Sequence, residues 1–187
     1  RITRATLLKI AEDTVASRAR SERTLVAAYL QGVLAGEEEP VLGGTADIDL
    51  VLIHDLEPAS PREIVRLTDD VHLDITHHTR SVYRQPRTLR VHPWLGPAIY
   101  HCKILHDPHH FLDFAQASVR DQFYLPMNML ARAQGQLDAA RKTWFAFQRG
   151  VEEPGLEEAA AFLDAIANTA NAIACLSGQP LTERRFM

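Results

Sequence analysis

The spacing of apolar residues changes along the chain, and it predicts both helices and strands in the first half. Residues 3–19 carry apolar side chains at helical spacing with charged residues between them, which predicts an amphipathic helix. Residues 25–30 and 47–53 are rich in branched apolar side chains and predict buried strands. Residues 71–76 alternate apolar and polar positions, as a half-buried strand does.

The segment between the last two of these strands carries the signals of a helix start. Ser60-Pro61-Arg62-Glu63 offers a capping hydroxyl, a Pro suited to the first helical position and a Glu three residues after the cap. This pattern predicts a helix over residues 60–69.

Helix-forming residues dominate the second half of the chain, and strand-type alternation ends there. Residues 103–105 are expected to add a short last strand to the sheet. We therefore predict an α+β fold, with a mixed-sheet core over residues 1–107 and a helical bundle subdomain over residues 108–187. The predicted helices of this subdomain cover residues 111–119, 127–149 and 156–176.

Charge and composition narrow the classes of partner. The net charge of −4 and the isoelectric point near 6.1 provide no overall positive field, which disfavours a nucleic-acid substrate. No apolar run approaches the roughly 20 residues of a membrane helix, so no membrane partner is expected. Cys102 and Cys175, without a CxxC pair, favour reduced thiols and a cytoplasmic location.

Three aspartates form the strongest candidate for chemistry. Asp47 and Asp49 are two residues apart in a predicted strand, so both side chains point to one face, and Asp74 lies in a neighbouring predicted strand. Clustered carboxylates repel one another unless a cation lies between them, and their hard oxygens suit magnesium. An Asp pair at the start of a strand also occurs as a solvated edge. The Gly-rich segment before the pair and the third Asp favour a metal site.

These residues resemble the motif of the nucleotidyltransferase superfamily, which includes DNA polymerase beta and the small antibiotic-modifying enzymes with a helical C-terminal subdomain. The family pattern is a strand ending in Gly-Ser, a spacer, Asp-hydrophobic-Asp, and later an Asp flanked by hydrophobic residues. This chain has Gly32-Val33, then thirteen residues, then Asp47-Ile48-Asp49, and later Leu73-Asp74-Ile75.

The resemblance implies a two-metal transfer of a nucleoside monophosphate from a nucleoside triphosphate to a hydroxyl group. Asp47 and Asp49 would bridge two Mg²⁺ ions, and Asp74 would bind the ion nearer the attacking hydroxyl and act as its base. The helical part would help to form the cleft and select the acceptor, a small molecule or a protein. The sequence leaves the acceptor, the choice of nucleotide and assembly as a homo-oligomer open.

One position departs from the family pattern. Val33 stands where the family has a Ser that contacts the nucleotide phosphates, so the nucleotide-binding residues expected from the resemblance begin with Gly32 and Val33. Gly43, Gly44 and Thr45 precede the Asp pair, and their backbone N–H groups and hydroxyl are candidates for phosphate binding. A tight turn into the strand explains the two glycines equally well.

Two alternatives follow from the same residues. The loss of the Ser hydroxyl favours a catalytically weak or inactive nucleotide-binding protein, or the neutralising partner of a toxin, over an enzyme.

The adjacent pairs His77-His78 and His109-His110 cannot direct both rings at one ion from a regular element, so we expect surface or loop histidines there.

Overall fold

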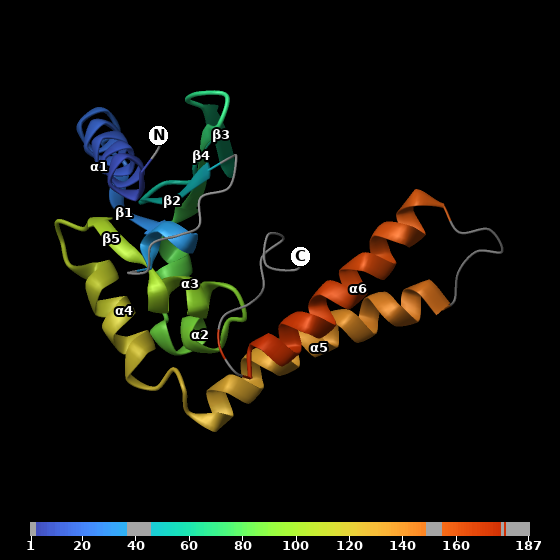
Figure 1. Cartoon of the computed structure of the whole chain (residues 1–187). Helices are drawn as coiled ribbons and strands as arrows, with labels where there is room; N and C mark the ends of the chain where they lie inside the picture. The colour runs from blue at the N-terminus through green and yellow to red at the C-terminus, as the bar shows by residue number, and fades with distance from the viewer. Residues whose placement is uncertain (1–2, 37–45, 149–154, 177, 179–187) are drawn as a thin grey trace. The chain divides into compact units, whose positions relative to one another are not determined.

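The computed structural model describes residues 3–36, 46–148, 155–176 and 178. The chain packs as two compact units, each considered separately below (Figure 1). The first unit comprises Arg1–Pro86 and Ala98–Ser118, and the second comprises Arg87–Pro97 and Val119–Met187. The expected boundary at residues 107 and 108 does not coincide with this division, because the helix after Pro108 belongs mostly to the first unit.

A five-stranded mixed sheet forms the centre of the first unit, with the strand order β3-β4-β2-β1-β5. Strands β2 and β4 run parallel, whereas the other three neighbouring pairs are antiparallel. The predicted α+β class, a mixed sheet together with helices, is confirmed. The strands are β1 (Leu25–Gln31), β2 (Ala46–His54), β3 (Arg62–Arg66), β4 (Val71–Thr79) and β5 (Lys103–His106).

One face of the sheet packs under the opening helix α1 (Arg4–Ser21), which lies alongside the strands in Figure 1. The helix begins at Thr3, whose hydroxyl accepts a hydrogen bond from the Thr6 backbone N–H at 3.2 Å. Its apolar stripe is fully buried against alternate residues of the two parallel strands. This core contains Leu7, Ala11 and Val15 of α1, Ile48, Leu50 and Leu52 of β2, and Val71, Leu73 and Ile75 of β4.

The opposite face of the sheet is covered at one end. Tyr29 of β1 is fully buried, and its hydroxyl lies 3.1 Å from that of Tyr83 in the 3₁₀ helix η2 (Arg80–Tyr83). The helices α3 (Leu95–His101) and α4 (Phe111–Asp121) carry further buried residues of this unit. Gln116 of α4 ties them together by donating to the backbone carbonyls of Ile99 and Cys102, both at 2.9 Å.

The predicted helix over residues 60–69 is wrong, because this segment forms the edge strand β3. Ile64 and Val65 are β-branched, and strand β3 pairs antiparallel with β4, so that Ile64 lies opposite Asp74. The Ser60 hydroxyl does not cap a helix; it lies 2.8 Å from the Arg62 backbone carbonyl and donates to it. Glu63 forms an ion pair with Arg18 of α1, in which Oε1 of Glu63 lies 2.6 Å from Nη2 of Arg18. The helix-start motif was therefore overridden by sheet pairing.

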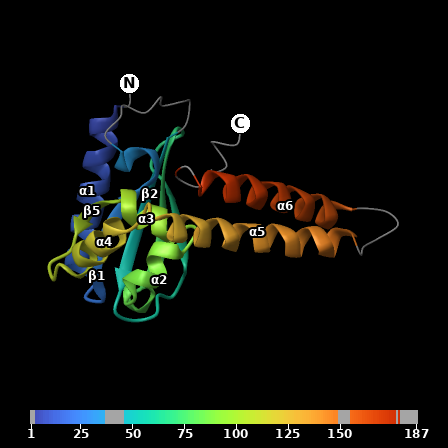
Figure 2. The same ribbon diagram turned by 90° about the horizontal axis from the view of Figure 1, so that it is seen from below.

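The second unit is built on two long helices, α5 (Pro126–Gln148) and α6 (Leu156–Ala174), which lie side by side (Figure 2). Together with α4 they confirm the helices predicted after Pro108, although the short helices α2 (Pro86–Val91) and α3 were not predicted. No helix in the part of the chain that the structure describes is long and apolar enough to cross a membrane.

The buried Arg132 connects helix α5 to two earlier segments of the second unit by hydrogen bonds. Its side chain is 1% exposed, and its guanidinium donates to the backbone carbonyls of Arg90 and Phe123, each at 2.9 Å. The same group lies 3.8 Å from the centre of the Phe123 ring, within the range of a cation–π interaction. Burial lowers the pKa of this guanidinium. Arg132 is thus a structural cation that joins α5 to the segments before it.

Candidate functional site

The three predicted aspartates lie on one face of the two parallel strands. In the register of β2 and β4, Asp49 is opposite Asp74 and Asp47 is opposite His72. These residues alternate with the buried apolar residues that face α1, so their side chains project from the other face of the sheet. Asp74 therefore lies on the same face of the sheet as Asp47 and Asp49, while the role of the three aspartates as ligands stays a prediction.

Gly32 explains how the end of β1 approaches this face. Gln31, the last residue of β1, pairs with Asp49, and Gly32 follows with a left-handed φ of 73°. A Cβ atom at Gly32 would lie 2.5 Å from Oδ2 of Asp49, well inside van der Waals contact. Gly32 is therefore favoured by its left-handed backbone conformation, and a side chain there would also displace the Asp49 carboxylate.

The remaining predicted nucleotide-binding residues divide into two groups. Val33, in the 3₁₀ helix η1 (Gly32–Ala35), is 53% exposed, so its apolar side chain is not part of the core. Gly43, Gly44 and Thr45 lie outside the described residues, and their part in phosphate binding stays a prediction.

Arg62 is a member of this face that the sequence analysis missed. It is the first residue of β3, and its guanidinium binds both oxygens of Asp74, with Nε at 2.8 Å from Oδ1 and Nη2 at 2.5 Å from Oδ2. The incorrect helix assignment hid it, because a helix does not place Arg62 beside Asp74. The signal was the adjacent β-branched pair Ile64 and Val65, which favours a strand.

His72 adds a second nitrogen donor group near the aspartates. Its Nδ1 lies 3.8 Å from Oδ1 of Asp47, a distance that gives an ion pair only when the imidazole is protonated. The face thus combines three carboxylates with one guanidinium and one imidazole. The guanidinium of Arg62 offsets part of the negative charge of the aspartates.

The fit of this face to magnesium can be judged from its donors. Carboxylate oxygens are the ligand type that Mg²⁺ prefers, and Asp49 and Asp74 present them from adjacent strands. Among the residues described, no group of three or more His, Cys, Asp or Glu side chains is positioned to hold a metal ion. Asp47 and Asp49 match the ligand chemistry of Mg²⁺ and their role as ligands stays a prediction, whereas both oxygens of Asp74 are engaged by Arg62.

A second group of polar residues lies on the α1 face of the sheet. Nε2 of His54 lies 3.0 Å from Nδ1 of His77, and the two rings stack with centroids 5.2 Å apart. Nδ1 of His54 lies 3.3 Å from the Thr24 hydroxyl, and Nε2 of His77 lies 3.6 Å from Glu63. Burial is the main cause that lowers the pKa of His54, and the charge of His77 lowers it further.

The expectation of surface or loop histidines is wrong for His77 and His78. Both are in strand β4, and Nδ1 of His78 lies 2.5 Å from the Tyr83 hydroxyl. Burial also lowers the pKa of His78. The expectation holds for His109 and His110, which are exposed in the segment before α4.

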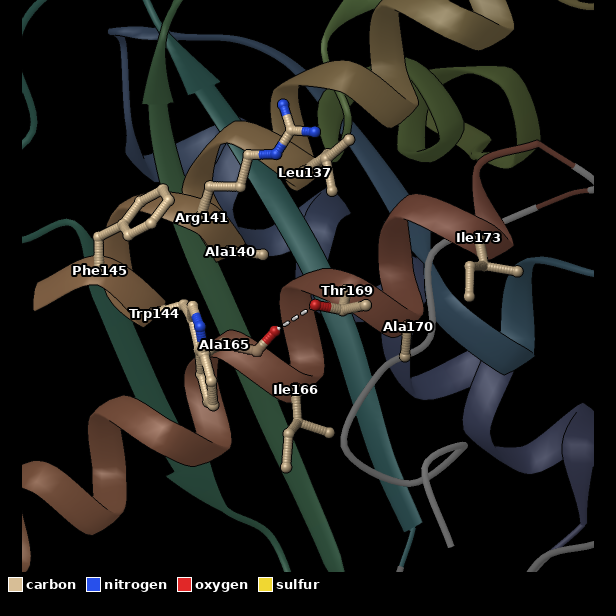
Figure 3. A pocket seen from close by; sticks show the side chains of 10 residues that line it. All are labelled: Leu137, Ala140, Arg141, Trp144, Phe145, Ala165, Ile166, Thr169, Ala170 and Ile173. Atoms are coloured by element: carbon tan, nitrogen blue, oxygen red, sulfur yellow. Dashed lines mark hydrogen bonds between the residues drawn. The ribbon is translucent and has the colours of Figure 1, made fainter. Parts of the chain in front are cut away.

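The second unit contains a groove of about 520 Å³ between α5 and α6 (Figure 3). Trp144 and Leu137 of α5 and Ile166 and Ile173 of α6 line it, and Arg141 lies at its edge. Its lining is almost wholly apolar, and it brings together none of the predicted site residues. The carboxylate face of the sheet therefore remains the candidate site.

Comparison with known proteins leaves the family of the chain open. No family model and no curated protein matches the sequence. Among solved structures, the chain is similar to a nucleotidyltransferase-like protein from Exiguobacterium sibiricum, with a TM-score of 0.44 and 10% sequence identity over 90% of this chain. The chain spans 55% of that protein's length. A similarity this low does not indicate what the chain does.

Proposed function

We propose that the chain transfers a nucleoside monophosphate from a nucleoside triphosphate to a hydroxyl group of a small molecule or a protein. The observation that carries this proposal is the register of the parallel strands, which aligns Asp49 with Asp74 and leaves Asp47 on the same face. Gly32 supports it, since it lies at the end of β1 so close to Asp49 that a Cβ atom there would displace the carboxylate. This arrangement agrees with the residues that carry the sequence resemblance.

Each carboxylate has a separate task in this proposal. Asp47 and Asp49 would hold Mg²⁺, which when bound neutralises the charge that builds on the oxygens around the α-phosphate. Asp74 would accept the proton of the attacking hydroxyl. The new bond forms between that hydroxyl oxygen and the α-phosphorus, the bond from the α-phosphorus to the bridging oxygen breaks, and pyrophosphate leaves.

A second candidate is a nucleotide-binding protein that transfers slowly or not at all, including the neutralising partner of a toxin. Val33 favours it, because an exposed apolar side chain replaces the hydroxyl of the family motif. The pairing of Arg62 with Asp74 favours it too, since the proposed base is engaged by a cation.

Metal-dependent binding of a nucleotide is the first test. We expect Mg²⁺ with a triphosphate to stabilise the folded state by mass action, by about 2.7 kcal/mol at a hundredfold excess over the Kd, and so to raise the thermal unfolding midpoint. Asp49→Asn should abolish most of this rise without loss of the fold. Asp55→Asn is the matched control, because Asp55 follows the other end of β2, is exposed and lies 3.4 Å from Arg80.

Release of pyrophosphate then separates the two candidates. The enzyme should release pyrophosphate from at least one triphosphate in the presence of hydroxyl acceptors, and Asp74→Asn should reduce release far more than it reduces nucleotide binding. Binding without release favours the second candidate. Binding that is equally strong in Asp49→Asn would place the nucleotide elsewhere, and no shift with any triphosphate would exclude the proposed function.

A further inference from the structure

The pairing of Arg62 with Asp74 has the geometry of a specific contact. Its two hydrogen bonds run from Nε and Nη2 to separate carboxylate oxygens, the side-by-side arrangement that makes arginine pairs with carboxylates directional. The Asp74 side chain is 23% exposed and that of Arg62 is 61% exposed, so the carboxylate is the more enclosed partner. Arg62 thus covers Asp74 from the edge strand.

The position of Asp74 explains why a cation is favourable there. Asp74 lies opposite Asp49 in the parallel register, and Asp47 is two residues before Asp49 in β2 on the same face. Carboxylates at this spacing repel one another, and a positive charge beside one of them reduces the repulsion. The guanidinium of Arg62 supplies that charge from within the chain.

We propose that Arg62 is an internal competitor of the divalent cation, holding Asp74 until a metal ion displaces the guanidinium. Both oxygens of Asp74 accept a hydrogen bond from Arg62, and the guanidinium charge beside them repels an approaching cation, so a metal ion at Asp74 competes with Arg62 for this carboxylate. The role of Arg62 is to weaken metal binding at Asp74. When little metal is present, Asp74 stays paired with Arg62. This inference rests on the proposed function, because it assigns a regulator to the same site.

Arg66 provides a matched control on the same strand. Ile64 lies opposite Asp74, and Arg62 and Arg66 are each two residues from Ile64, so both project from the same face of β3. Arg66 instead binds Asp69, with Nη2 at 2.5 Å from Oδ1. Both arginine side chains are mostly exposed. Replacing either one with glutamine therefore removes the same charge from the same strand, but only one replacement frees Asp74.

The first test is the Kd for Mn²⁺, used alone as a probe and measured by electron paramagnetic resonance of the free ion. We expect Arg62→Gln to bind Mn²⁺ about fivefold more tightly than Arg66→Gln, which is the effect of an exposed ion pair. Equal affinities in the two variants would overturn the competition while leaving metal binding intact. No Mn²⁺ binding in the wild type or in either variant would overturn both the competitor role and the proposed magnesium site.

The second test does not depend on the proposed function, because it is made without divalent cations. We expect Arg62→Gln to lower the thermal unfolding midpoint by about 2 °C in the wild-type background and to leave it unchanged in the Asp74→Asn background. Circular dichroism confirms that each variant is folded. An equal change in both backgrounds would show that the pair contributes nothing in solution, and would overturn the inference whether or not the protein transfers nucleotides.

Discussion

Replacing Gly32 with alanine tests the geometry of the carboxylate face most directly. The glycine has a φ of 73°, and an added Cβ would meet Oδ2 of Asp49 at 2.5 Å and its Cγ at 3.5 Å. The substitution therefore has two separate costs. One is the left-handed backbone, which an L side chain rarely adopts, and the other is the displacement of the Asp49 carboxylate.

The magnitude of each cost follows from the structure. The left-handed conformation costs a residue with a Cβ about 1–2 kcal/mol. The steric contact falls on the end of a side chain, so Asp49 can relieve it by rotation, at about 0.5–1.5 kcal/mol for leaving its preferred rotamer. We expect Gly32→Ala to reduce the free energy of unfolding by about 2–3 kcal/mol.

Urea unfolding followed by far-ultraviolet circular dichroism measures this change, and Gly36→Ala is the control. Gly36 has a φ of −71°, and its Cβ would meet only the Val33 carbonyl at 3.7 Å, an ordinary contact. Gly36→Ala should therefore be neutral, or stabilise by up to about 1 kcal/mol through the unfolded chain.

A second background separates the two costs of Gly32→Ala. In Asp49→Ala the carboxylate is absent, so Gly32→Ala should then cost only the backbone part, about 1–2 kcal/mol. A loss in Gly32→Ala no larger than in Gly36→Ala would refute the close approach of η1 to β2. If Gly32→Ala lowers the free energy of unfolding equally with and without the Asp49 carboxylate, only the steric contribution is refuted and the backbone contribution stands.

Two further predictions concern stability away from the carboxylate face. The pKa of His54 is lowered below the ordinary value of 6.5, so the unfolded state binds more protons as the pH falls through 6.5, and the free energy of unfolding should decrease from about pH 7.5 to about pH 5.5. His54→Gln should make this decrease smaller and exposed His109→Gln should not, in urea unfolding at both pH values; an unchanged decrease in His54→Gln would contradict the reasoning. Arg132→Met should cost about 3 kcal/mol, because it leaves one buried and one partly buried backbone carbonyl without their donor, whereas exposed Arg141→Met should change stability by less than about 0.5 kcal/mol. Equal effects of the two arginine replacements on the urea midpoint would contradict the structural role of Arg132.

The sequence by itself determined the elements whose apolar residues follow one clear period. Strand β4 was predicted from the alternation of its apolar and polar residues, and strand β2 from its run of branched apolar residues. The helices α1, α4, α5 and α6 were recognised for the same reason, since their apolar residues recur at helical spacing. The fold class and the three aspartates therefore followed from local pattern.

Only the tertiary structure decided which residues surround those aspartates. The segment of Arg62 carries a local helix signal, yet pairing with β4 made it a strand, because hydrogen bonds along an edge of the sheet outweigh a weak cap. The same pairing brought Arg62 to Asp74, and the packing of α1 brought Glu63 to Arg18. Such contacts join residues far apart in the chain, and their register is set by the assembled sheet and by no periodicity within a single segment.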